Sequence, residues 1–465
     1  MKPRKIFKRI IAVALVLLVI FLIRYCWVSV PVITGYGAKV VCSTIFVAGR
    51  SEADAMKEEV GFSPLNLANY TINHKDSSVT CSVFGFAKRK AIFRRGLGAT
   101  LVVELPEEEV RAQQFRLATK PVVHAAQLPW PSGDLLNDSL PAFVNQQALV
   151  NAVESGFLEK DSTQLIRTRA IVVLYDGKLV AEKYAPGFSK ESRLTGWSMT
   201  KSITGALTGI LVKQGKLDPE AAAPVKEWSD PKDPRHVITL KDLLQQSSGL
   251  DFLEDYSKYS DATRMLFMRA DMGTYTANRD LKHKPGSVFN YTSGNSNLIS
   301  RIIRNTVGEK DYHAFPYEAL FHKIGMYSAI MEPDAKGNFV ASSYCYATAR
   351  DWARFGLLYI NNGNFNGQQL LPEYWVSASV TPGPATTNGE YGYQLWLNRG
   401  GKQNASRTYP RLPADMFFAD GFEGQNIFII PSRKLVVVRL GLTQKGAYDV
   451  ETLLTDIMDA ISQPE

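Results

Sequence analysis

Two β-hairpin patterns lie at opposite ends of the last three-quarters of the chain, with helical patterns between them. In the first, 168–187, "TRAIVVLYDGKLVAEKYAPG", two apolar runs flank Asp176-Gly177, a dipeptide typical of two-residue hairpin turns. In the second, 424–441, "GQNIFIIPSRKLVVVRLG", two apolar runs are joined by a Pro-Ser turn, and a helical pattern follows at 448–462. Strands at both ends with helices between them predict a largely antiparallel sheet assembled from distant segments, an α+β fold.

A serine and a lysine open the predicted helix at 196–217, "GWSMTKSITGALTGILVKQGKL", whose apolar residues recur on one stripe. Ser198 and Lys201 fall about one turn apart on the same face of the first turn, where free backbone N–H groups favour an anion. A lysine desolvated among apolar neighbours loses its proton more readily and can serve as the base that a serine nucleophile needs. In the alternative interpretation, Ser198 is an N-cap and Lys201 a solvated helix residue.

Composition supports a folded protein with a substantial core and gives no indication of nucleic-acid binding. The chain has 465 residues, long enough for two domains, and its 45% hydrophobic content supports a substantial core. The net charge is +8, but six of the positive charges lie within the first 24 residues, which contain no acid. The remainder is nearly neutral, so nucleic acid is not an expected partner.

Those early charges precede "IIAVALVLLVIFLI", fourteen apolar residues at 10–23, which "YCWVSVPVI" extends past Arg24. No A-x-A cleavage site follows. Residues 1–34 are therefore predicted to be an uncleaved signal-anchor rather than a cleaved signal peptide. The positive-inside rule then sends the rest of the chain out of the cytoplasm. The expected location is the bacterial inner membrane, with the catalytic domain in the periplasm.

A small β-rich region is predicted at 35–130, from the strand-like runs "KVVCSTIFVAG", "SSVTCSVFGFA" and "ATLVVEL". The basic run "AKRKAIFRR" within it is interpreted as a solvated strand-and-turn face. "QLPWPSGD", at 127–134, is rich in Gly and Pro and is interpreted as a linker. The helices and hairpins described above then form a domain at 135–465.

The four cysteines and six histidines do not form a metal-binding pattern, because no C-x-x-C is present and the histidines are scattered. No metal or other cofactor is expected. Cys42 and Cys81 lie in the same exported region, so they either pair in an oxidising compartment or remain two free thiols in strands.

Three motifs in order make the chain recognisable: "SMTK" after the first hairpin, "FNYTSGNSN" further on, and "DGFEGQNIFIIP" at the second hairpin. Their order and spacing resemble the serine β-lactamase and penicillin-binding protein superfamily. Segments such as "ITLKDLLQQSSGLDF" and "YATARDWARFGLLYINNG" also resemble that superfamily's connecting segments. The chain also resembles the branch of esterase- and amidase-like hydrolases that includes 6-aminohexanoate-dimer hydrolase, partly through "DFLEDYSKYSD". The resemblance implies an antiparallel sheet flanked by helices, with a helical subdomain.

The resemblance also implies catalytic roles. Ser198 would be the acylated nucleophile, Lys201 its general base, and Tyr291 a hydroxyl that shares protons with Lys201. The backbone N–H groups of Ser198 and Gln425 would form the oxyanion hole. The residues expected to line the substrate pocket are Ser293, Phe422, Glu423, Gly424 and, in "DFLEDYSKYSD", Tyr256.

Two departures from the family pattern bear on the substrate. Ser293 stands where β-lactamases usually have asparagine, and the third motif reads Phe422-Glu423-Gly424, without the usual lysine or histidine. That basic group helps β-lactamases and D-Ala carboxypeptidases hold a substrate carboxylate, which Phe422 cannot do. The prediction is therefore an exported serine hydrolase acting on small esters or amides. The alternatives are a D-amino-acid peptidase or β-lactamase, and a catalytically weak penicillin-binding-like module that binds peptidoglycan fragments. The oligomeric state is left open.

Overall fold

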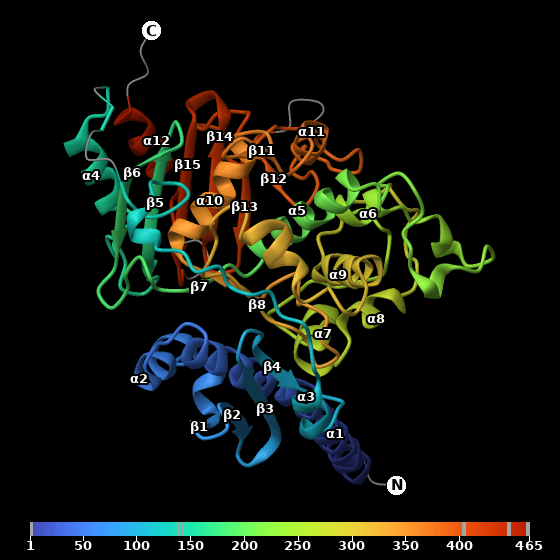
Figure 1. Ribbon diagram of the computed structural model, residues 1–465. Helices are drawn as coiled ribbons and strands as arrows, with labels where there is room; N and C mark the ends of the chain where they lie inside the picture. Colours follow the sequence, from blue (N-terminus) through green and yellow to red (C-terminus); the bar gives the residue numbers. More distant parts are fainter. Residues whose placement is uncertain (1–2, 137–139, 142, 402–405, 444–447, 462–465) are drawn as a thin grey trace. The chain divides into compact units, whose positions relative to one another are not determined.

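The computed structural model describes residues 3–136, 140–141, 143–401, 406–443 and 448–461 (Figure 1). The chain forms two compact units, each described here by itself. Unit 1 comprises Met1–Arg95, Ala99–Ala112 and Leu253–Ala270, and unit 2 comprises Gly96–Gly98, Gln113–Phe252 and Asp271–Glu465. The segment 253–270 therefore packs with the N-terminal unit, although it lies within the predicted hydrolase domain of the sequence.

Unit 1 consists of one long helix beside a four-stranded sheet. The sheet has the order β1-β2-β3-β4, and its β1–β2 and β2–β3 pairs are antiparallel. Its elements are α1 (Pro3–Phe46), α2 (Glu52–Asp54), β1 (Asn69–Asn73), β2 (Ser78–Val83), β3 (Phe86–Arg94), β4 (Gly98–Val102), α3 (Glu107–Ala112) and α7 (Asp261–Met268).

The prediction of a strand at "KVVCSTIFVAG" was wrong, because residues up to Phe46 continue α1. A short apolar run rich in β-branched residues does not by itself distinguish a strand from a buried helix. Here the helix that contains the apolar N-terminal run continues to Phe46, and Gly49, three residues later, has a φ of +71° that is incompatible with a further helical turn. Its last turns are buried against the sheet of unit 1 at Val40, Val41 and Cys42. Cys42 and Cys81 are both buried and both are free thiols.

Unit 2 is built on a six-stranded sheet of order β12-β13-β14-β15-β5-β6, and every neighbouring pair in it is antiparallel. The first predicted hairpin supplies β5 and β6, with Asp176 and Gly177 at φ of +48° and +76°, and the second supplies β14 and β15. The two hairpins meet where β15 pairs with β5. The predicted α+β fold is confirmed. The strands are β5 (Thr168–Tyr175), β6 (Lys178–Tyr184), β12 (Trp396–Leu397), β13 (Phe417–Gly421), β14 (Gln425–Ile430) and β15 (Leu435–Gly441).

Helices cover both faces of this sheet, so its central strands are buried on both sides (Figure 1). Alternate side chains of a strand point to opposite faces. Val172 and Leu174 pack with α5 and α10, whereas Ile171 and Val173 pack with α4 and α12. Because both faces are apolar, β5 and β15 read as nearly continuous apolar runs. The helices are α4 (Gln146–Ser155), α5 (Met199–Lys213), α10 (Ala349–Ile360) and α12 (Val450–Asp459).

The remaining elements of unit 2 are short helices and two small sheets, of order β7-β9-β8 and β10-β11. The helix α9 (Ser293–Val307) begins at the second motif and packs against α5 within one apolar core. The others are β7 (Leu194–Thr195), α6 (Leu240–Leu244), α8 (Met272–Ala277), β8 (Ile330–Met331), β9 (Cys345–Ala347), β10 (Asn364–Phe365), β11 (Gln368–Gln369) and α11 (Glu373–Ser379).

The segment predicted as a linker, 127–134, is docked on α10 by a buried arginine. Arg354 donates to the carboxylates of Asp351 and Asp134, both at 2.8 Å, and to the backbone carbonyls of Pro131 and Gly133. Its guanidinium also lies 4.5 Å from the ring centre of Trp130. The Gly and Pro residues that suggest a linker instead form an ordered loop whose carbonyls accept hydrogen bonds from Arg354.

We expect Arg354→Met to lower the free energy of unfolding by about 3–5 kcal/mol, because it strands buried carboxylates and carbonyls without their partner. The measurement is urea unfolding of the full chain in detergent. Arg116→Met is the matched control: Arg116 pairs with Glu318 and Asp311 at the surface, and losing such a pair changes stability little. Equal losses in the two variants would contradict this role for Arg354.

Candidate active site

Ser198 stands at the start of α5 on a turn that the backbone holds under strain. Trp197, just before it, has a φ of +44°, which is uncommon for a bulky residue and costs of order 1–3 kcal/mol. Ser198 occupies the N-cap position, but its side chain makes no capping hydrogen bond. The N-cap alternative requires the serine hydroxyl to accept a hydrogen bond from a backbone N–H in the first turn of the helix, and it accepts none there.

Lys201 is the residue that contacts this hydroxyl. Its side chain is 1% exposed, and its Nζ donates to Ser198 Oγ at 2.9 Å. The same Nζ donates to Ser293 Oγ at 3.2 Å and to the backbone carbonyl of Ser342 at 3.1 Å. The interpretation of Lys201 as a solvated helix residue is therefore wrong. The amine is buried, and three oxygens from three segments of the chain fix its direction.

Tyr291 lies beside the same amine, in the segment just before α9. The Lys201 Nζ is 4.8 Å from the centre of the Tyr291 ring. That ring packs against Trp396 and Tyr391, with centroid distances of 5.1 and 5.7 Å. Thr292 then caps α9 and Ser293 begins it. The second motif therefore brings both Tyr291 and Ser293 to the Lys201 amine.

A buried network of amide side chains holds these segments together, and the sequence analysis missed it. Gln246 Oε1 accepts from the Thr292 N–H at 3.0 Å and from Asn295 Nδ2 at 2.9 Å. Gln394 Oε1 accepts from Ser296 Oγ at 2.7 Å, and the Gln394 backbone carbonyl accepts from Ser202 Oγ at 2.7 Å. Both glutamines have a φ of +57°. No local motif marks them, because their partners are distant in the sequence.

The third motif reaches the nucleophile's loop through the end of β13. A Cβ built on Gly421 would lie 2.2 Å from the Gly196 carbonyl oxygen, so only glycine fits there. The next residue, Phe422, packs edge-on against Trp197 at 5.8 Å and is 47% exposed. An exposed aromatic ring thus occupies the position where the family pattern has a cation.

The other third-motif residues lie in the turn between β13 and β14. Glu423 and Gly424 both have positive φ, +63° and +79°. Gln425 begins β14, and its side-chain amide donates to the carbonyls of Phe422, Glu423 and Gly441. The Gln425 side chain therefore stabilises the turn.

A buried arginine supports this turn from β15. Arg439 is 0% exposed, and its Nη1 donates to the Gly424 carbonyl at 2.7 Å. Its Nη2 donates to the Ile166 carbonyl and to Thr168 Oγ1, at 2.7 and 2.8 Å. Burial lowers the pKa of Arg439 to about 10. All of these acceptors lie inside the protein, so the Arg439 guanidinium stabilises the turn between β13 and β14. It does not replace the exposed lysine or histidine of the family's third motif.

Asp420, the residue before Gly421, is the carboxylate whose charge reaches Lys201. Burial raises its pKa to about 6, while the hydrogen bond from Asn426 and the charge of Lys201 oppose this rise. The Asn426 Nδ2 donates to Asp420 Oδ1 at 2.7 Å. Asp420 was not predicted as a site residue, although its carboxylate lies directly before Gly421 and two residues before the third motif.

Tyr256 is the one predicted pocket residue that belongs to unit 1. It is 43% exposed, and its hydroxyl donates to Glu254 at 2.7 Å. Among the described residues, no group of three or more His, Cys, Asp or Glu side chains is placed to hold a metal ion.

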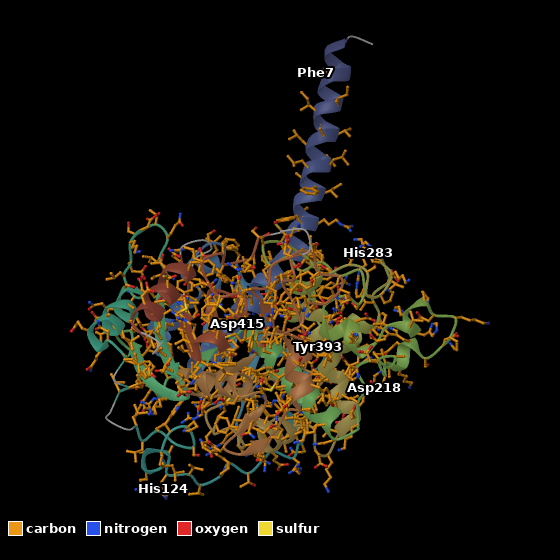
Figure 2. All side chains as sticks on the ribbon, turned by 90° about the horizontal axis from the view of Figure 1, so that it is seen from above. Phe7, His124, Asp218, His283, Tyr393 and Asp415 are labelled. Atoms are coloured by element: carbon orange, nitrogen blue, oxygen red, sulfur yellow. The ribbon has the colours of Figure 1, made fainter. Side chains whose placement is uncertain are left out.

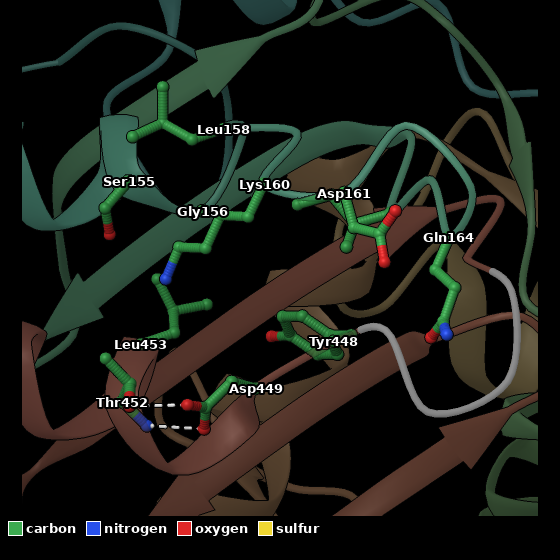
Figure 3. A pocket seen from close by; sticks show the side chains of 11 residues that line it. Ser155, Gly156, Leu158, Lys160, Asp161, Gln164, Tyr448, Asp449, Thr452 and Leu453 are labelled. Atoms are coloured by element: carbon green, nitrogen blue, oxygen red, sulfur yellow. Dashed lines mark hydrogen bonds between the residues drawn. The ribbon is translucent and has the colours of Figure 1, made fainter.

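A separate cavity of about 210 Å³ lies between α4 and α12 (Figure 3). Lys160, Asp161, Tyr448 and Asp449 are among its lining residues. The Tyr448 ring lies 4.3 Å from the Arg439 guanidinium, so this cavity adjoins the residues that hold the third motif. Its serine, Ser155, donates to the Ala152 carbonyl at 2.8 Å, a hydrogen bond within α4.

Comparison with known proteins agrees with this geometry. The family model described as Beta-lactamase matches residues 150–459. The chain is similar to 6-aminohexanoate-dimer hydrolase of Paenarthrobacter ureafaciens, at 25% identity, over 59% of this chain and 72% of that protein.

Solved structures show the same fold. A penicillin-binding protein homologue from Caulobacter crescentus superposes with a TM-score of 0.52 at 16% identity, covering 70% of this chain and 98% of that one. A family VIII carboxylesterase superposes with a TM-score of 0.52 at 13% identity, covering 68% and 96%. With the family model spanning both hairpins and all three motifs, the chain belongs to the β-lactamase family and is a serine hydrolase.

Proposed function

We propose that this protein is an exported, membrane-anchored serine hydrolase that cleaves small esters or amides through an acyl-enzyme on Ser198. The single observation that carries the proposal is the 2.9 Å hydrogen bond between the buried Lys201 Nζ and Ser198 Oγ. A serine hydroxyl is a weak nucleophile until a base takes its proton. A buried amine at hydrogen-bond distance is such a base.

In the proposed reaction, the neutral Lys201 amine takes the Ser198 proton while Oγ attacks the substrate carbonyl carbon. The tetrahedral intermediate then collapses, and the leaving alcohol or amine receives a proton from the Lys201–Tyr291 pair. Water attacks the acyl-enzyme in the second half, with the same groups as base, and releases the acid and free Ser198. Ser293 and the Ser342 carbonyl keep the amine aimed during both halves.

Two backbone N–H groups would stabilise the negative oxygen of the intermediate. The Ser198 N–H lies at the positive end of α5 and is the first. Gln425 was predicted to supply the second, but it begins β14, on the far side of the turn. Gly421 and Phe422 make the contacts with the nucleophile's loop. The Phe422 N–H is therefore the donor that this geometry favours.

The membrane part of the proposal rests on α1. One described helix is long and apolar enough to cross a membrane: Ile10–Phe46, with a mean hydropathy of 2.7 in its most apolar window. The basic residues before it favour a cytoplasmic N-terminus and an exported catalytic domain.

The substrate class follows from Phe422. The 6-aminohexanoate-dimer hydrolase of P. ureafaciens is named for a 6-aminohexanoate dimer, which has an amide bond and a free carboxylate, and the carboxylesterase is named for esters. An exposed ring beside Trp197 offers apolar contact to a neutral acyl group and no charge to a carboxylate. This observation favours ester or amide cleavage over the peptidase and β-lactamase alternatives.

Ser198→Ala should abolish labelling of the full chain by a fluorophosphonate. Lys201→Ala should keep the fold and lower turnover at least about 10²-fold, as expected for a lost general base. Tyr291→Phe should lower turnover less than Ser198→Ala does, because only a proton shuttle is removed. Ser155→Ala, in the other cavity, is the control and should label normally. Labelling that survives Ser198→Ala, or none at all in the unmodified protein, would support a binding module or a different nucleophile.

Phe422→Lys should move the substrate preference toward anions. A charge-assisted hydrogen bond contributes about 1.5–3 kcal/mol, so the kcat/KM ratio of a carboxylate-ended to a neutral p-nitrophenyl ester should rise roughly 10–100-fold. Phe422→Leu, which stays apolar, should leave the ratio nearly unchanged. The unmodified enzyme should prefer the neutral ester and turn over little nitrocefin. Efficient nitrocefin hydrolysis, or an unchanged ratio in Phe422→Lys, would defeat this account of the third motif.

The raised pKa of Asp420, to about 6, predicts a pH dependence. Because this pKa lies above the ordinary value, Asp420 is neutral in the folded protein below it and charged above it, where its ionisation costs stability. Once charged, Asp420 favours the ammonium form of Lys201 over the free base. Asp420→Asn should therefore shift the base ionisation in the kcat/KM profile to lower pH. It should also reduce the loss of stability that accompanies a rise in pH from about 4 to about 6, the interval between the ordinary and the raised pKa of Asp420.

Profiles of kcat/KM and urea unfolding across this pH range provide the measurement. Asp415→Asn serves as the control, because it removes a carboxylate that accepts hydrogen bonds from the Ser432 N–H and hydroxyl. If Asp420→Asn and the unmodified protein have the same profile, Asp420 does not act on Lys201.

A further inference from the structure

The tip of the β2–β3 hairpin in unit 1 displays two phenylalanines to solvent. Phe84 and Phe86 are each 76% exposed. Phe84 and Gly85 have φ of +49° and +80°, the conformation of a tight turn in which Asn-Gly is preferred. A phenylalanine in the left-handed region is uncommon and unfavourable. Phe84 is thus costly both in backbone conformation and in exposed apolar surface, and the fold of the hairpin does not require it.

Contacts with α1 fix the direction in which this tip points. Thr34 Oγ1, early in the sheet-packed part of α1, donates to the Ala87 carbonyl at 2.6 Å. At the other end of the helix, the Phe46 ring packs on Phe93 and on His74, at 5.9 and 5.6 Å. The strand β3 therefore runs along α1 in the same sense, and its first residues lie toward the helix N-terminus. The tip precedes Ala87, so it points toward the apolar end of α1.

The apolar end of α1 is the part proposed to cross the membrane. Its described side chains from Ile10 to Trp27 are exposed, and Trp27 is 80% exposed, whereas burial begins in the turns that follow (Figure 2). About 20 helical residues span a bilayer core, so a span that begins at Ile10 ends near Ser29. Thr34 lies five residues further, or about 8 Å at 1.5 Å per residue. The hairpin tip, extending back from that level, falls in the headgroup region.

The side chains around the tip have the chemistry of that region. Tyr25 and Trp27 on α1 stand where aromatic residues gather at a membrane interface. Lys88 is exposed just after Phe86 and offers a cation to lipid phosphates. Lys90, by contrast, is paired with Asp76 and Glu107. Apolar rings followed by an exposed cation match an interface in which acyl chains lie below phosphates.

We infer that the hairpin tip 84–88 inserts into the outer headgroup layer of the membrane that α1 crosses, with Phe84 and Phe86 among the upper acyl chains. This contact would fix the sheet of unit 1 on the membrane surface, giving α1 a second point of attachment. The inference rests on the proposed membrane span of α1, and the experiment separates the two.

The test uses the full chain with Cys26→Ser, because Cys26 is exposed and the other three cysteines are buried. A single new cysteine carries an environment-sensitive nitrobenzoxadiazole label at Leu17, Lys88 or Lys75. Lys75 lies in the β1–β2 turn next to His74, beside Phe46 at the opposite end of α1. The protein is reconstituted into vesicles of phosphatidylethanolamine and phosphatidylglycerol, with or without acyl chains brominated near the headgroup.

The expected result is blue-shifted emission and quenching by brominated lipid at Leu17 and Lys88, and quenching by aqueous iodide at Lys75. Replacing Phe84 by Asn and Phe86 by Thr should remove the lipid quenching at Lys88 and leave that at Leu17. The Asn suits the turn, so this variant is expected to fold.

Lipid quenching at Leu17 but none at Lys88 would overturn the inference while α1 still spans the membrane. No lipid quenching at either position would overturn the membrane anchor as well. Quenching at Lys88 that persists in the Phe84→Asn, Phe86→Thr variant would show that the phenylalanines are not the inserted groups. Protection of Lys88 from iodide without lipid quenching would indicate a protein partner, or a second copy of this chain, instead of lipid.

Discussion

The hydrogen bond from the buried Lys201 amine to Ser198 Oγ is the interaction on which the rest of the site depends. An amine this deeply buried is tolerated only where several oxygens receive it, and here Ser198, Ser293 and the Ser342 carbonyl do so. These acceptors come from α5, from α9 and from the loop before β9. The fold of unit 2 can therefore be understood as the arrangement that brings three distant segments to one nitrogen.

The sheet reaches the nucleophile's loop through the end of β13, and the proposed substrate preference rests on this contact. Gly421 must be glycine because of the Gly196 carbonyl, and this close approach brings Phe422 beside Trp197. Arg439 holds the following turn from inside the protein. The cation near the third motif, Arg439, is therefore buried and structural, whereas the exposed residue of that motif, Phe422, is aromatic. The proposed preference for a neutral substrate rests on that difference.

The strongest sequence predictions were those with local causes. The Asp176-Gly177 turn, the alternating faces of the hairpin strands and the three ordered motifs each have a short-range signature, and the α+β fold follows from them. The continuation of α1 to Phe46 was missed, because a β-branched apolar run has no fixed preference until its packing partner is known. Gln246 and Gln394 could not be predicted, since their roles consist of hydrogen bonds to residues far away in the sequence. The contacts between 127–134 and Arg354 could not be predicted either, because more than 200 residues separate them in the sequence.

The central claim is that Ser198 becomes acylated with Lys201 as its base. Its most direct test is rapid acid quenching of the enzyme during turnover of a neutral p-nitrophenyl ester, followed by peptide mass mapping. The account predicts an acyl group on the peptide that contains Ser198, and a slower build-up of that adduct in Lys201→Ala. An acyl group on a different residue, or turnover with no covalent adduct together with unimpaired activity in Ser198→Ala, would contradict it.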